Sequence, residues 1–481
     1  MDALLDTRPV AASSPADAFL DALEADFARL KAGYSAQPYP SLAQRRAWLD
    51  VLEGLLKSQA EAIADAIDAD FGGRSRNETR LAELFPSLEA VRHARRHLRR
   101  WMRPSRRSVS IWFAPGRARV QYQPLGVVGV IVPWNYPLYL AVGPLVGALA
   151  AGNRVMIKLS EYTPAFGALF ARLIAQAFPA DLVSVSNGGP EVASAFSRLP
   201  FDHLLFTGST SVGRHVMRAA ADNLTPVTLE LGGKSPTVVA PGFDIATAAR
   251  RIAFGKMMNA GQTCVAPDYV LVPQGQETAF LDEMRRVVRG FYGDGRGPDY
   301  TSVVNGRHYA RLTGLLDDAR ERGARLEPLL DTAELPGHKL TPTLVLGVDD
   351  GMKIMQEEIF GPVLPVMAYR ELDEAIAYIN AHDRPLALYL FDNDTVRREA
   401  LLRRTHSGGV TINDCMLHVA QDNLPFGGVG PSGMGHYHAE EGFRTFSKAR
   451  GIFTQSRLNA LSIFHPPHGK LAAFVLKLML R

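Results

Sequence analysis

The residue best suited to nucleophilic chemistry is Cys264, in the segment MNAGQTCVAPDY. Glycine and polar residues precede it, which is typical of a turn and favours an accessible thiol over a core position. The thiolate is the reactive form, so a catalytic site would have to favour it. The structural alternative is an inert cysteine that packs as a small apolar side chain.

Two further segments carry groups that could act with such a thiol. Glu230 ends an apolar run in TLELGGKSP, where burial would raise the pKa of the carboxyl group and suit it to act as a general base. Asn135 lies between prolines in VPWNYP, and a side-chain amide can stabilise an oxyanion. A satisfied surface carboxylate and a turn-stabilising asparagine are the structural alternatives.

A phosphate-binding turn is predicted at FTGSTSVG, which follows the apolar run HLLF and precedes a predicted helix. Glycine before a helix leaves N–H groups exposed beside the positive end of the helix dipole. The segment is not GxGxxG, and any strand–helix turn would also fit it. Lys158 and Glu161 come at and after the end of another apolar run, where they could hydrogen-bond ribose hydroxyls or form a surface pair.

The elements that must position these groups follow from hydrophobic spacing. Apolar residues at three-to-four spacing predict helices over 17–70, and a basic helix is expected over 78–103. Short β-rich runs then alternate with helical segments, which predicts βαβ units and a parallel sheet. A second alternating set follows Cys264. The chain has 481 residues, and because single cores stop growing near about 250–300 residues, we expect two α/β domains.

Composition narrows the class of protein. The chain has two cysteines, too few for a disulfide framework or a cysteine-rich zinc site, so we expect a reducing, cytoplasmic location and no metal. The net charge of +4 is weak support for a polyanionic partner. Residues 92–107 carry eight arginines, for which we favour a solvated helix face, or an arm that pairs with the acidic surface of another subunit, over a nucleic-acid or anionic-surface site.

Two apolar stretches raise the question of a membrane. Residues 120–153 carry no charge, but four prolines interrupt them, so we expect a buried strand, a turn and a buried helix and no transmembrane span. The C-terminal LAAFVLKLML is ten residues long and too short to span a bilayer. Packing on the body is the default; covering a substrate entrance and peripheral membrane contact are the alternatives.

Seven motifs occur in an order that resembles the aldehyde dehydrogenase superfamily, over residues 20 to 455. They are VPWNYP, IKLSEYTP, FTGSTSVG, LELGGKSP, GQTC, EEIFGPV and PFGGVGPSGMG. The phrases GQTCVAPDYV and GGVTINDCMLH are similar to the class-3-like branch of that family.

The resemblance implies a role for each group. Cys264 would attack an aldehyde to give a thiohemiacetal and then a thioester, Asn135 and the Cys264 N–H would hold the oxyanion, and Glu230 would activate water. Hydrolysis is favoured over acyl transfer to coenzyme A because Glu230 is present. NAD is the expected cofactor, since Glu161 would repel a 2′-phosphate, although NADP is also compatible. The residues implied to bind it are Trp134, Lys158, Glu161, Gly208, Ser209, Val212, Gly213, Leu231, Glu358 and Phe360.

The resemblance also implies an aldehyde dehydrogenase-like α/β fold in several parts. Residues 1–103 and 124–230 would bind the cofactor, 231–411 would form the catalytic domain, 104–123 and 412–450 an oligomerisation arm, and 451–481 a C-terminal tail. A homodimer is expected. The substrate would be an aromatic aldehyde such as coniferyl aldehyde, or a medium- or long-chain aliphatic one. A different semialdehyde dehydrogenase, or a non-catalytic structural or binding protein on this fold, is the alternative.

Overall fold

The computed structural model describes residues 15–332 and 334–480, and two sheets organise them. The first has six strands in the order β15-β7-β6-β3-β4-β5. Five of these strands, β3 to β7, follow one another in the sequence. They are parallel and largely buried, as expected for apolar runs covered on both faces. They are β3 (Val127–Ile131), β4 (Arg154–Lys158), β5 (Val183–Ser186), β6 (His203–Gly208) and β7 (Val227–Leu231).

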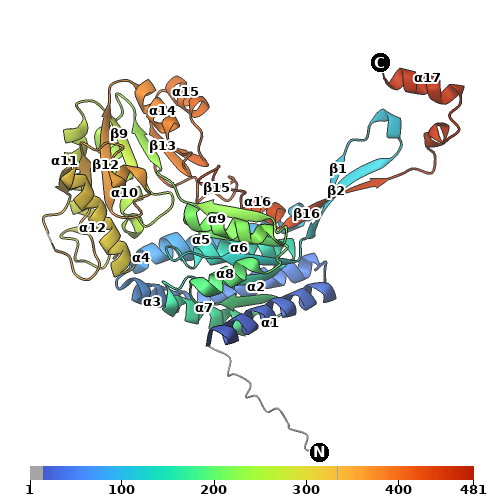
Figure 1. The fold of residues 1–481 in the computed structure, drawn as a ribbon, viewed down its shortest axis with the longest axis horizontal. Helices are drawn as coiled ribbons and strands as arrows, with labels where there is room; N and C mark the ends of the chain where they lie inside the picture. Colours follow the sequence, from blue (N-terminus) through green and yellow to red (C-terminus); the bar gives the residue numbers. More distant parts are fainter. Residues whose placement is uncertain (1–14, 333, 481) are drawn as a thin grey trace, which may run out of the picture.

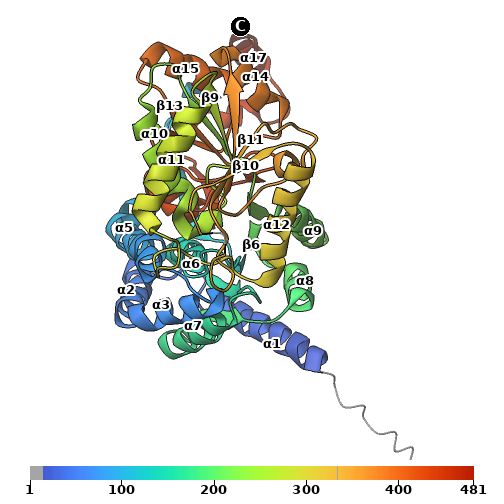
Figure 2. The ribbon, with the colours of Figure 1, turned by 90° about the vertical axis from the view of Figure 1, so that its left-hand side faces the viewer.

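Helices cover both faces of this sheet (Figures 1 and 2). The predicted helical region 17–70 forms three helices, and the predicted helix 78–103 is interrupted near its start by one π-helical segment, η1 (Arg80–Leu84). The helices are α1 (Pro15–Ala36), α2 (Leu42–Ser58), α3 (Ala60–Phe71), α4 (Arg76–Thr79), α5 (Phe85–Trp101), α6 (Tyr139–Ala151), α7 (Pro164–Ala177), α8 (Pro190–Arg198) and α9 (Thr210–Ala221).

The second sheet has seven strands in the order β10-β11-β12-β9-β8-β13-β14, and only β10 runs antiparallel to its neighbour. The two α/β domains predicted from the alternating runs are therefore confirmed. The strands are β8 (Pro236–Val239), β9 (Tyr269–Pro273), β10 (Arg325–Pro328), β11 (Thr343–Leu346), β12 (Val363–Tyr369), β13 (Ala387–Phe391) and β14 (Gly409–Ile412). The main helices around it are α10 (Ile245–Met257), α11 (Glu277–Tyr292), α12 (Gly306–Glu321), α14 (Leu372–Ala381) and α15 (Thr395–Arg404).

A third, antiparallel sheet projects from the body as an arm (Figure 1). It contains β1 (Ser105–Arg107), β2 (Arg117–Pro124) and β16 (Ser447–Thr454). The expected range 104–123 holds the first two strands, whereas 412–450 reaches only the start of β16. The difference arises because β14 extends the seven-stranded sheet, and β15 (Gly433–Met434) returns to pair with β7.

The arginine-rich segment lies mainly on α5 and is paired with acidic side chains of the same chain. Arg92 Nε lies 3.0 Å from Glu53 Oε1, and Arg95 Nη1 lies 2.7 Å from Asp50 Oδ1. The two arginines remain partly exposed, which agrees with the solvated helix face favoured from the sequence, and their acidic partners come from the same chain.

The uncharged stretch 120–153 forms the end of β2, then β3, a turn and α6. Within residues 15–332 and 334–480, none of the helices is long and apolar enough to cross a bilayer. The C-terminal apolar run forms α17 (Lys470–Met479), which lies beyond the arm (Figure 1). Its side chains are mostly exposed, so packing on the body, the default expectation, is not what the described residues show.

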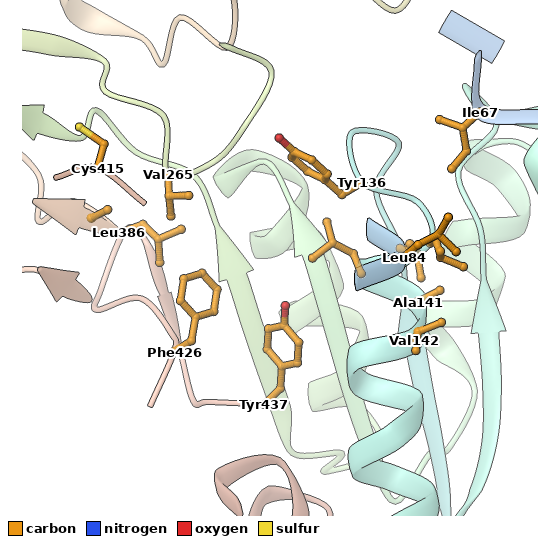
Figure 3. Packing of buried hydrophobic residues seen from close by; sticks show 14 of the residues in the cluster. Ile67, Leu84, Tyr136, Ala141, Val142, Val265, Leu386, Cys415, Phe426 and Tyr437 are labelled. Atoms are coloured by element: carbon orange, nitrogen blue, oxygen red, sulfur yellow. The ribbon is translucent and has the colours of Figure 1, made fainter. Parts of the chain in front are cut away.

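One apolar core connects the two parallel-sheet domains. Figure 3 shows Phe426 and Tyr437 between Val265 and Leu386 on one side and Val142 of α6 on the other. All five side chains are buried. The two domains therefore share packing, and the surfaces that carry the predicted chemistry face each other from fixed positions.

Candidate active site

Four parallel strands of the six-stranded sheet end along one edge, where the predicted site residues gather. Ile131 at the end of β3 is level with Lys158 at the end of β4, and Gly208 of β6 is level with Leu231 of β7. The carboxyl edge of a parallel sheet is where α/β proteins bind ligands, because the strand-to-helix loops converge there.

Cys264 enters this region on a tight loop that follows α10. The loop begins with η3 (Met258–Gly261), in which Asn259 and Ala260 both have positive φ, 52° and 50°. Such conformations are strained for residues with a side chain, and they persist where surrounding contacts hold them. Gly261 continues the turn with φ 73°, and a Cβ there would overlap the carbonyl oxygen of Gly361. The Cys264 side chain is left partly exposed, as the turn predicted.

The Asn135 amide lies beside this loop. It is almost fully buried, and its Nδ2 donates a hydrogen bond to the Gln262 carbonyl oxygen at 3.1 Å. A primary amide has two N–H groups, so one remains for another acceptor close to the nucleophile. The Asn135 carbonyl oxygen accepts bonds from Arg74 Nη1 at 2.8 Å and Asn259 Nδ2 at 3.0 Å.

Glu230 lies on β7, and its backbone is level with Gly433 of β15. The side chain is 3% exposed, and neither carboxyl oxygen has a hydrogen-bond partner among the described residues. Burial raises the pKa of Glu230 well above its ordinary value. An unpartnered carboxyl group with a raised pKa is a proton acceptor held ready for a reacting group.

The Cys264 thiol shares this environment with two carboxyl groups. Burial, followed by the charges of Glu358 and Glu230, raises the pKa of Cys264 to about 12. Each neighbouring anion disfavours a second negative charge. The charge of Glu230 acts on Cys264, so the predicted nucleophile and the predicted base share one environment, and the positive charge of a bound ligand would favour their ionised forms.

The residues predicted for the cofactor line the same sheet edge. Ser209 caps α9, accepting a bond from Val212 N, and Val212 is 47% exposed on the first turn. Gly213 faces the Leu231 side chain so closely that a Cβ would collide with it. Lys158 is buried and donates to the carbonyl oxygens of Leu159 and Gly188 at 2.6 and 2.7 Å, while Glu161 is exposed.

Glu358 and Phe360 close the other side of this region. A Cβ at Gly232 would overlap the Glu358 carboxyl group, so the glycine is what lets this side chain lie against the backbone. Burial and then Asp268 raise the pKa of Glu358 to about 8. Phe360 has φ 50° and its ring lies 5.4 Å from that of Trp134, in an edge-on arrangement. These features fit a dinucleotide: a helix N-terminus for phosphate, polar groups for ribose, and a carboxyl group and aromatic rings beside the thiol.

Sequence reasoning missed several buried residues of the site. Tyr437 is 1% exposed, and burial together with the charges of Tyr139, Glu230 and Cys264 raises its pKa. Its ring lies 4.4 Å from His438, which is stacked on Phe426 at 4.9 Å. These residues come from a segment expected to belong to the arm, so nothing in the spacing pointed to them.

Comparisons with known proteins agree with this geometry. The family model described as "Aldehyde dehydrogenase family" matches residues 11–452. A probable coniferyl aldehyde dehydrogenase of Pseudomonas aeruginosa is 58% identical, covering 96% of this chain and 97% of its own. A coniferyl aldehyde dehydrogenase of a Pseudomonas species is 47% identical, with 94% and 95% covered. The substrate-bound structure of Staphylococcus aureus AldH has a TM-score of 0.90 at 38% identity, with 95% and 99% covered.

The fold and site define an NAD(P)-dependent enzyme that oxidises aldehydes. The chain belongs to the aldehyde dehydrogenase family. Solved relatives bind NAD⁺, including an indole-3-acetaldehyde dehydrogenase of P. syringae at 26% identity and TM-score 0.83, over 91% of this chain and 89% of that one. Relatives of dog, rat and mouse named as dimeric and NADP-preferring are 38%, 39% and 44% identical. NAD with NADP as a compatible alternative is therefore the cofactor assignment.

Proposed function

We propose that the enzyme oxidises an aromatic aldehyde of the coniferyl type to its carboxylic acid through a thioester on Cys264. The observation that carries this proposal is the meeting of the Cys264 thiol with the unpartnered, buried Glu230 carboxyl group at the sheet edge. Thiolate attack on the carbonyl carbon forms a C–S bond and an oxyanion, which the free Asn135 N–H and the Cys264 N–H stabilise. A bound nicotinamide supplies the hydride acceptor.

Hydrolysis then regenerates the thiol. Glu230 accepts a proton from water as the water oxygen attacks the thioester carbon, and the C–S bond breaks to release the acid. The carboxyl group can do this because burial gives it a raised pKa and leaves no protein partner in competition with water.

A buried aromatic cluster that includes Tyr437, whose pKa is raised by burial and by the charge of Cys264, supports a flat, aromatic substrate. Tyr437, His438 and Phe426 form stacked and edge-on contacts, and Tyr139 Oη lies 3.4 Å from His438 Nε2. Aromatic rings favour such arrangements with other rings. Long-chain, lipid-soluble aldehydes are the second candidate, favoured by the exposed apolar α17 and by a relative at 39% identity named 4,4'-diaponeurosporen-aldehyde dehydrogenase.

A kinetic panel tests the proposal. Initial rates of reduced-cofactor formation with coniferyl-type, aliphatic and semialdehyde substrates should give the highest kcat/KM for the first class. Cys264→Ala should abolish turnover with every substrate, because no other thiol lies at this edge. Normal turnover in that variant would refute the mechanism, and a preference for long aliphatic aldehydes would favour the second candidate.

We propose a homodimer in the cytoplasm, assembled through the arm. In the order β1-β2-β16 one edge of β16 is unpaired, and β14 is likewise an edge of the seven-stranded sheet. Unpaired edges present N–H and C=O groups to which another chain can add. Light scattering should give the mass of two chains, and Ile452→Pro within β16 should give one; a native monomer would refute this assignment.

We also propose peripheral contact between the C-terminal tail and an anionic membrane surface. Leu471, Phe474 and Leu478 of α17 are 59%, 67% and 51% exposed, and residues 446–481 hold six lysines and arginines with no acidic residue. Apolar side chains with cations on one helix are typical of interfacial binding. Phe474→Asp should abolish sedimentation with anionic vesicles, whereas Val396→Asp, at an exposed apolar site on the body, should not. Equal sedimentation of both variants would refute the contact.

A further inference from the structure

We propose that Arg74 is a positioning residue for acylation: it fixes the peptide that carries the oxyanion-binding amide of Asn135. The inference rests on the proposed role of Asn135. Arg74 lies between α3 and α4, 61 positions before Asn135 in the sequence, and neither spacing nor motif connects the two.

Arg74 is held in one orientation by contacts on several sides. Its side chain is fully buried, and Nη1 lies 2.8 Å from the Asn135 carbonyl oxygen and 3.1 Å from Glu83 Oε1. The guanidinium also lies 4.9 Å from the rings of Phe71 and Tyr136. A planar guanidinium between two rings has little rotational freedom, so it can act as a rigid donor to the Asn135 peptide.

Glu83 extends this arrangement to the helix that follows Asn135. It lies in the π-helical segment η1, and its Oε2 accepts bonds from the N–H groups of Leu138 and Tyr139 at 2.7 and 3.2 Å. These N–H groups open α6, where a carboxylate is favoured by the helix dipole. One buried ion pair thus holds both the Asn135 carbonyl and the start of the next helix.

A second donor reaches the same carbonyl from the nucleophile loop. Asn259 Nδ2 donates to the carbonyl oxygens of Asn135 at 3.0 Å and Gln262 at 3.1 Å. Asn259 is held in turn by Glu78, which accepts a bond from its backbone N–H at 3.0 Å. The Asn135 peptide is therefore fixed from two sides, and its side chain spans to Gln262, two residues before Cys264.

The position of the oxyanion-binding amide of Asn135 therefore depends on Arg74 and Glu83, which do not take part in the reaction themselves. Preorganised donors stabilise an oxyanion because they need not reorient as charge develops. A misplacement of about 1 Å can cost about 100-fold in rate. Loss of the Arg74 bond should therefore slow acylation while binding of the cofactor and the overall fold are retained.

The experiment is a double-mutant cycle on the single-turnover rate of acylation, with Arg74→Lys and Asn135→Ala. Lysine keeps the charge beside Glu83 but lacks the planar group that lies against Phe71 and Tyr136 and holds Nη1 beside Asn135. We expect Asn135→Ala to lower the rate about 100-fold or more and Arg74→Lys to lower it about 10- to 100-fold. In the Asn135→Ala background, Arg74→Lys should change it by less than about 3-fold.

Arg45→Lys is the matched control. Arg45 is equally buried and donates to the carbonyl oxygens of Ala150 and Ala151 at the other end of α6, at 3.0 and 2.7 Å. It should keep the wild-type acylation rate, because it does not contact the Asn135 peptide. Asn259→Gly keeps the positive φ but removes the second donor to the Asn135 carbonyl. If Arg74→Lys fails to fold, Asn259→Gly should show the same loss of acylation rate that is expected for Arg74→Lys.

Each result decides one question. The positioning role would be overturned if the rate effects of Arg74→Lys and Asn135→Ala multiply in the double variant. It would also be overturned if folded Arg74→Lys and Asn259→Gly acylate at the normal rate. Either result would leave the role of Asn135 intact. A normal rate in Asn135→Ala would instead overturn the oxyanion assignment itself. An unchanged KM for NAD across the variants is required for a role confined to acylation.

Discussion

Replacing Glu230 with glutamine separates its cost to stability from its use in catalysis. The carboxyl group is 3% exposed, its two oxygens have no partner in the described structure, and burial raises its pKa well above the ordinary value. Below an unfolded-state pKa of about 4.3 the group is protonated in both states. As pH rises above that value the unfolded chain releases the proton more readily, so the folded state loses relative stability.

The magnitude follows from linkage. Each unit of pKa difference between the folded and unfolded states corresponds to about 1.4 kcal/mol, so the raised pKa of Glu230 predicts a higher free energy of unfolding for Glu230→Gln than for the wild type at pH 8. Near pH 5 the gain should be much smaller. Urea unfolding at pH 5, 6.5 and 8 measures the trend, and Glu161→Gln, an exposed carboxylate at the same sheet edge, should show none.

The same variant should lose hydrolysis and keep acylation. Loss of a general base costs about 100- to 10,000-fold, so mixing with aldehyde and NAD should give one turnover of reduced cofactor and a covalent acyl-enzyme detectable by mass spectrometry. A stability gain that does not depend on pH would show that the carboxyl group is solvated. Absence of the acyl-enzyme together with a lost burst would show that Glu230 acts before, not after, the thioester.

Three further predictions follow from single contacts. Burial and the charges of Glu358 and Glu230 raise the pKa of the Cys264 thiol to about 12. Alkylation of this thiol in the cofactor-free enzyme should therefore accelerate about tenfold per pH unit between about pH 7 and 9. A plateau within that range would contradict this prediction. Gly261→Ala would place a methyl group against the Gly361 carbonyl at φ 73°, so we expect loss of activity with a lowered Tm, and unchanged kinetics would show that the loop is not constrained. Glu161→Gln should lower KM for NADP relative to NAD, because a carboxylate repels the 2′-phosphate; an unchanged ratio would place the discrimination elsewhere.

The parts predictable from sequence were those in which local pattern and chemistry coincide. Buried parallel strands appear in the sequence as apolar runs. Lys158, Gly208 and Leu231 lie at the ends of such strands, so their position along one edge of the sheet follows from the topology. Cys264 and Glu230 stood out because each lies near glycine in a distinctive segment, but their roles were implied by the order of the family motifs more than by either residue.

The parts that could not be predicted depend on contacts between distant segments. Arg74, after α3, meets Asn135, before α6, only through the tertiary fold, and a single buried arginine has no periodic signal. Tyr437 was placed in the arm because the resemblance implied an arm over 412–450, whereas β14 and β15 pair with strands of the two parallel sheets. Strand pairing over such separations is set by tertiary packing, which no local propensity encodes.

The pairing of β15 with β7 has a consequence for biogenesis. Gly433 lies beside Glu230, so one side of β7 is paired by residues made about 200 positions later in the chain. While the ribosome synthesises the intervening segment, β7 presents an open edge to other nascent chains. Chains that stop before residue 433 would keep this edge open, so we expect them to be prone to aggregate.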